Sequence, residues 1–91
     1  MEYEWVQKSY PSIYDSCYEI VANAMAAESV YFGKKEEFSE MQVYDKTKEL
    51  FKDCQLLGAE DTLLIHMWFR RCCDFASCCM DNVINSIVYQ N

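Results

Sequence analysis

The chain has 91 residues, the size of one domain, and its 52% hydrophobic and 25% charged residues exclude a disordered composition. Its net charge of −7, from 15 acidic and eight basic residues, argues against direct binding to nucleic-acid phosphates or anionic membranes, which attract lysine and arginine. No uninterrupted apolar run approaches the ~20 residues needed to span a bilayer. We therefore expect one globular domain over residues 1–91, whose acidic surface either serves solubility or suits a basic partner protein.

The N-terminal segment, MEYEWVQKSY, is predicted to be an arm over residues 1–10. It lacks the positive charge and apolar stretch of a secretory signal, so a cytoplasmic location with reduced cysteines is expected. Tyr3 and Trp5 would share one side of an extended strand, but ten residues cannot form a sheet alone. We expect an extended arm or a short helical turn that packs Trp5, a candidate contact residue, onto the domain. The alternative is an arm that reaches a second subunit.

The first long helix is predicted over residues 12–32, with Ser12 and Asp15 at capping-box spacing and Gly33 at its end. Glu28 falls within the apolar face, where a lone buried carboxylate would be costly. The functional interpretation is a general acid or a specific ion-pair partner, and the ordinary one is a side chain that reaches solvent at the helix end. The apolar face comprises Ile13, Cys17, Ile20, Val21, Ala24, Met25, Ala27 and Tyr31.

The second long helix is predicted over residues 39–57, because Ser39 and Gln42 form an S-x-x-Q capping box and Gly58 follows the pattern. Its exposed face carries a row of acids at i, i+4 and i+8. Such a row can imitate backbone phosphates toward a basic groove, or it can be a solvated face neutralised by neighbouring lysines. The candidate acidic surface comprises Asp45, Glu49, Asp53, Glu36, Glu37 and Glu40.

The third long helix is predicted over residues 60–88, about 28 residues or ~42 Å. Its apolar face is unusually wide and longer than the second helix can cover. Such a face is typical of a central helix packed by two neighbours or by a second subunit, which suggests a homodimer. This face comprises Ile65, Trp68, Phe69, Cys72, Phe75, Ala76, Cys79, Met80, Val83, Ile84 and Ile87.

The segment RRCCDFASCC holds four of the six cysteines. Helical geometry turns Cys72 and Cys79 into the core and Cys78 toward water, so Cys78 is the candidate reactive thiol. The C-C-x4-C-C spacing lacks the CxxC knuckle of zinc sites, and we predict no metal and no cofactor. Arg70 and Arg71 either pair with Asp74 or anchor an interface with a partner protein. With Trp5, these two arginines complete the set of candidate partner-binding residues.

Catalytic signatures are missing from the sequence, which has no glycine-rich phosphate loop, no G-x-S-x-G and no H-E-x-x-H. We therefore predict that the protein is not an enzyme. The three helical patterns predict an all-α fold, a three-helix up-down-up bundle with an N-terminal arm. The leading function is a protein-interaction module that self-associates and binds or blocks a partner protein. The alternatives are a phage or mobile-element inhibitor of a host nucleic-acid enzyme or defence system, acting through its acids, and a cysteine-based metal or redox module.

Overall fold

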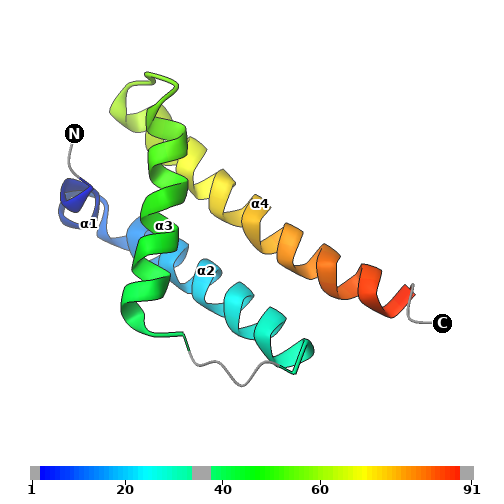
Figure 1. Ribbon diagram of the computed structural model, residues 1–91. Coiled ribbons are helices and arrows are strands. Elements are labelled where there is room, and N and C mark those ends of the chain that lie inside the picture. Colours follow the sequence, from blue (N-terminus) through cyan, green and yellow to red (C-terminus); the bar gives the residue numbers. More distant parts are fainter. Residues whose placement is uncertain (1–2, 34–37, 89–91) are drawn as a thin grey trace.

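The computed structural model describes residues 3–33 and 38–88, which form four helices and contain no strand (Figure 1). They are α1 (Glu4–Ser9), α2 (Pro11–Tyr31), α3 (Glu40–Gln55) and α4 (Asp61–Val88). The predicted all-α class is confirmed, and the three long helices lie within two residues of the predicted bounds. The N-terminal segment adopts the helical alternative, as the short helix α1.

Helices α2 and α4 lie side by side and run in the same direction, and α3 is inclined across them (Figure 1). Contacts follow this parallel register. The rings of Tyr14 and Trp68 lie 6.3 Å apart near the start of the pair, and Asn82 meets Glu28 near its end. The predicted up-down-up bundle is not confirmed in that form, because α3 crosses the pair instead of aligning with it. The crossing leaves the C-terminal end of α4 beyond the reach of α3.

The helix ends show which sequence signals act. Ser39 Oγ accepts a hydrogen bond from the Gln42 amide at 3.2 Å and Gln42 Oε1 accepts one from the Ser39 amide at 2.8 Å, so this capping box is confirmed. The predicted box at Ser12 is wrong, because α2 already begins at Pro11, and Tyr10 at its N-cap makes no side-chain bond. Proline suits that first position, since its fixed φ matches the helix and no amide is lost.

Both glycines end helices as the sequence predicts. Gly33 follows α2 with φ +68° and Gly58 follows α3 with φ +72°. This left-handed conformation costs glycine little, while a Cβ would clash with the following carbonyl. The tight turn at Gly58 returns the chain directly into α4.

The core centres on Trp68, which is fully buried where α4 meets α3. Its ring packs edge-on against Phe51 at 5.5 Å and against Tyr3 at 5.8 Å, geometries that aromatic pairs favour. Helix α1 closes this end with the fully buried Val6, and Trp5 is half-buried against Phe51. Trp5 therefore packs onto the domain, as the sequence predicts.

The far end of the molecule is thinner. The molecule measures 47 × 24 × 19 Å, and past Cys79 every residue of α4 up to Val88 is at least partly exposed.

Across the described residues, no helix combines the length and apolarity that a membrane crossing requires. The exposed large apolar side chains are Val30, Tyr31, Phe32, Met41, Leu56, Leu57, Leu63, Phe69, Met80, Ile84, Ile87 and Val88.

Candidate functional site

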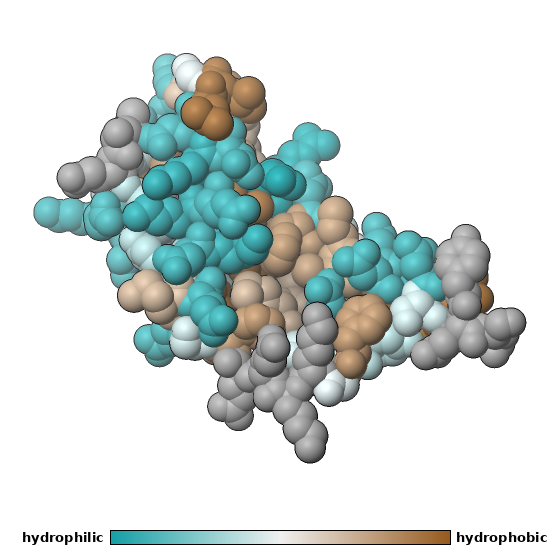
Figure 2. Space-filling view, viewed as in Figure 1, coloured by the Kyte–Doolittle hydropathy of each residue, from teal (hydrophilic) through white to brown (hydrophobic). Residues whose placement is uncertain are grey.

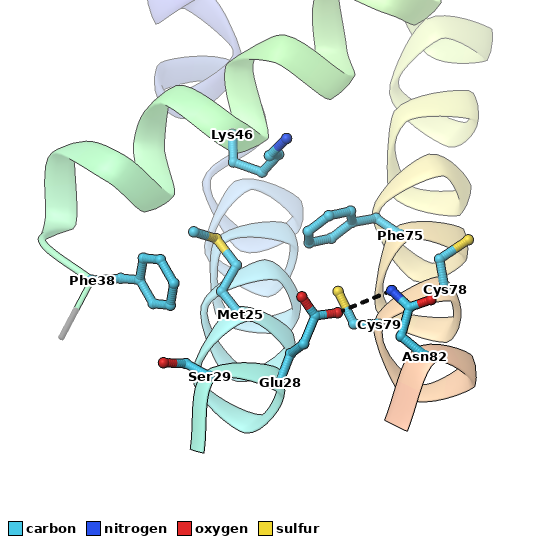
Figure 3. Close-up of a pocket in the computed structure, with 9 residues that line it drawn as sticks. All are labelled: Met25, Glu28, Ser29, Phe38, Lys46, Phe75, Cys78, Cys79 and Asn82. Carbon is cyan, nitrogen blue, oxygen red and sulfur yellow. Dashed lines mark hydrogen bonds between the residues drawn. The ribbon is translucent and has the colours of Figure 1, made fainter. Parts of the chain in front are cut away.

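A hollow of about 330 Å³ lies where α3 departs from the α2–α4 pair (Figure 3). Hydrophobic surface gathers in the recess between α3 and α4 on this face of the molecule (Figure 2). We call it the three-helix hollow. Its lining comes from four stretches distant in sequence: Met25, Glu28 and Ser29 of α2, Phe38 before α3, Lys46 of α3, and Phe75, Cys78, Cys79 and Asn82 of α4.

Glu28 provides the only carboxylate among the described residues that line the three-helix hollow. Its side chain points up into the hollow, between Met25 and Cys79 (Figure 3), and Oε2 accepts a hydrogen bond from the Asn82 amide nitrogen at 3.3 Å. No lysine or arginine among the described residues forms an ion pair with it. Within the described part of the chain, the carboxylate is thus held by a neutral donor and has no ion-pair partner.

Lys46 is the cation of the lining, and other groups engage it. Its Nζ lies 3.2 Å from Glu49 and 5.5 Å from the centre of the Phe75 ring. In Figure 3 its ammonium turns away from the carboxylate below. Lys46 therefore closes the upper rim without neutralising Glu28.

The two cysteines of the hollow differ in environment. Cys79 is buried, and desolvation, followed by the nearby Glu28 carboxylate, raises the pKa of its thiol to about 11. Its sulfur points into the hollow in Figure 3, while that of Cys78 points away. Cys78 is exposed, as predicted, and is the most accessible thiol of the segment RRCCDFASCC.

Three further cysteines meet inside the core, one from each long helix. The thiols of Cys17 and Cys72 contact each other; this hydrogen bond, together with burial, raises the pKa of Cys72 far above its usual value. Burial also raises the pKa of Cys54, which lies near Cys72. Cys72 is fully buried, as the helical pattern predicted, and all six cysteines are free thiols. No group of three potential ligands among the described residues surrounds a metal position.

The predicted acidic row is exposed on α3, but two of its members have basic partners. Glu49 pairs with Lys46 at 3.2 Å, and Asp53 lies 3.7 Å from Arg71 of α4. The predicted pairing of Arg71 with Asp74 is thus replaced by a bridge between helices. Of the other candidate residues, Asp45, Glu40 and Arg70 are exposed, whereas Glu36 and Glu37 lie outside the described residues.

A second surface runs along α2 and α4. Phe69, Met80, Ile84 and Ile87 of α4 are separated by 11, four and three residues, so they share one stripe of the helix. Beside the stripe, a small depression is lined by α2 and α4 alone, without any residue of α3. We call this stripe and depression, with the exposed Tyr31, the apolar band. The depression is lined by Ala24, Ala27, Glu28, Ala76, Cys79, Met80 and Val83.

Comparisons with protein-family models, with curated proteins and with solved structures found no match to this chain. The arrangement of its own residues therefore carries the functional argument. Sequence reasoning selected Glu28 from its place in an apolar face but missed the hollow around it. Phe38 and Lys46 line the same hollow as Glu28 because α3 is inclined, and no local pattern encodes that inclination.

Proposed function

We propose that this protein is a non-enzymatic interaction module that self-associates through the apolar band and presents its remaining surface to a partner protein. The observation that carries the proposal is the exposure of large apolar side chains in one continuous stripe. Met80, Ile84 and Ile87 are 51%, 48% and 55% exposed, although their helix supplies the centre of the core. Contiguous apolar surface of this kind marks interaction sites in small proteins.

The charge distribution supports the same surface. A quarter of the chain is charged, yet the apolar band contains a single charged residue, Glu28 at one edge of the depression. With a net charge of −7, two copies repel at long range, so self-association needs a contact face from which charges are absent. Interface cores are depleted of charge in the same way.

The size of the band fits a dimer. Two helices side by side are about 20 Å wide, and the 20 residues from Phe69 to Val88 extend about 30 Å, which gives roughly 600 Å² in projection. Accessible surface exceeds projected area on a ridged helix face, so the band approaches the ~800 Å² per partner of a standard interface. The small alanines of the depression let a facing copy approach closely, and a two-fold axis would satisfy both copies at once.

Sedimentation equilibrium over a wide concentration range tests this proposal. The wild-type chain is expected to be dimeric at high concentration, and Ile84→Lys is expected to be monomeric because it places a charge in the apolar band. Leu56→Lys is the matched control, since Leu56 is 86% exposed in the turn after α3, away from the band. A monomer at all concentrations, or equal dissociation by both substitutions, would contradict self-association through the band.

A further inference from the structure

We propose that the three-helix hollow receives a single basic side chain, lysine or arginine, of a partner protein. This inference rests on the proposed function, because it names the chemistry of the partner that the module binds. It concerns a neighbouring surface, on the side where α3 crosses the pair, which shares Glu28 and Cys79 with the depression of the apolar band but also includes residues of α3 and the segment before it.

The walls of the hollow suit the stem of such a side chain. The rings of Phe38 and Phe75 face the space from opposite sides, and the thioether of Met25 lies between them (Figure 3). Lysine and arginine bury their methylene chains along apolar surfaces of this kind and keep the charged head at a polar end. The ring faces add a favourable interaction with a nearby cation.

The floor suits the charged head. The Glu28 carboxylate is aimed into the space, and the hydrogen bond from Asn82 fixes its orientation. The raised pKa of Cys79 keeps its thiol protonated at neutral pH, so the thiol itself adds no second negative charge there. A carboxylate that has no cationic partner among the residues the structure describes, at the base of an apolar recess, gains most from a ligand that brings positive charge.

Other classes of ligand fit less well. An anion would be repelled by Glu28, and the Lys46 ammonium is not free to attract it, because it already pairs with Glu49 and lies over Phe75. A purely apolar group would cover the carboxylate without compensating its charge, which is costly. The overall charge of −7 also draws basic partners to this surface and repels acidic ones. The space of about 330 Å³ admits one long side chain but not a folded element.

Binding can be measured with the peptide Ac-Gly-Arg-Gly-NH2 and its counterpart in which citrulline replaces arginine, a change that removes charge and keeps shape. Amide chemical shifts are followed by NMR during titration of the Ile84→Lys protein. The arginine peptide is expected to bind with a millimolar dissociation constant and to shift the resonances of Phe75, Cys79 and Asn82. The citrulline peptide is expected to bind at least about tenfold more weakly, because it loses a charge-assisted hydrogen bond.

Glu28→Gln is expected to weaken the arginine peptide by at least about tenfold. The matched control, Glu19→Gln, removes the same charge from an exposed position of α2 outside the hollow and is expected to leave binding unchanged. Phe38→Ala, which removes one wall from the segment before α3, is expected to weaken binding several-fold. Phe38→Ala provides an independent test of the hollow if the Glu28→Gln protein does not fold.

Equal binding of the two peptides, equal effects of Glu28→Gln and Glu19→Gln, or an absence of shifts at tens of millimolar peptide would overturn the assignment. Shifts confined to other surfaces would do the same. The oligomeric state is read separately by sedimentation. A monomeric wild-type chain that still binds the arginine peptide would therefore refute only self-association. A dimer that does not bind the peptide would refute only the binding of a basic side chain in the three-helix hollow.

Discussion

The indole nitrogen of Trp68 donates a hydrogen bond to the backbone carbonyl of Thr47 at 3.0 Å, inside the core. The bond joins α4 to α3 across 21 residues of sequence. The Thr47 side chain turns back to its own helix and donates to the carbonyls of Val43 and Tyr44. A polar pairing at the centre of an aromatic cluster therefore fixes where α3 crosses α4, since unpaired buried polar groups are costly.

Trp68→Phe should lower the free energy of unfolding by about 2 kcal/mol, because it removes the buried donor and leaves space beside Phe51. Trp5→Phe is the matched control, since the buried Trp5 indole nitrogen has no hydrogen-bond partner in residues 3–33 and 38–88. Trp5→Phe should lower the free energy of unfolding clearly less, because an unsatisfied donor is removed together with the lost ring area. Urea unfolding followed by circular dichroism measures both; a cost for Trp5→Phe equal to that for Trp68→Phe would contradict this explanation.

Ser39→Ala should destabilise the protein by about 1 kcal/mol, because the capping box satisfies amides at the start of α3. Ser12→Ala makes the same chemical change at the position where the sequence wrongly suggested a cap. Since Ser12 caps no helix, its substitution should change stability by less than about 0.5 kcal/mol. Thermal or urea unfolding of the two variants compares them directly, and a larger effect at Ser12 would refute the assigned cap.

Alkylation of the native protein by iodoacetamide should label Cys78 first, because it is the exposed cysteine. Cys17 and Cys72 are fully buried and contact each other, so their labelling requires an opening of the structure. Mass spectrometry of digested samples resolves the order of labelling. All six thiols should react after unfolding without reductant, and labelling of Cys72 as fast as Cys78 would contradict the packing of α2 on α4.

The free energy of unfolding should fall as the pH rises from about 9 to about 11, the usual and folded-state pKa values of Cys79. The unfolded chain releases the Cys79 proton near the lower value and the folded protein near the higher one, so the stabilisation is complete below pH 9 and lost through pH 11. Burial of Tyr3 raises its pKa as well and extends the loss to higher pH.

Cys79→Ala should therefore reduce the slope of stability against pH in this interval, apart from a pH-independent cost of the lost packing. Cys78→Ser, at the neighbouring exposed position, should retain the wild-type slope. Urea unfolding in the presence of a phosphine reductant at several pH values measures both slopes. Identical slopes for Cys79→Ala and the wild type would exclude Cys79 as a source of the pH dependence.

The helices could be predicted from the sequence because their signals are local. The Ser39 cap, the two glycines and the periodicity around Trp68 and Cys72 each act within a few residues, and each agrees with the structure. The same periodicity placed Cys78 in water. Ser12 misled because Pro11 satisfies the start of α2 equally well, and capping spacing alone does not distinguish the two positions.

The arrangement of the helices could not be read in this way. The inclination of α3 depends on long-range contacts such as that of Trp68 with Thr47. Arg71 has Asp74 close by in sequence, but the inclined α3 brings Asp53 within reach. The three-helix hollow is a consequence of that inclination. Its one signal in the sequence is Glu28, a charged residue within an apolar helix face.

The parallel register of α2 and α4 has a consequence for how the chain folds. Contacts between these helices join residues as far apart as Glu28 and Asn82, 54 positions, whereas Trp68 reaches Thr47 across 21. Closing the longer loop costs about 0.8 kcal/mol more in chain entropy. We expect α3 and α4 to associate as an inclined hairpin around Trp68 before the parallel contacts between α2 and α4 form.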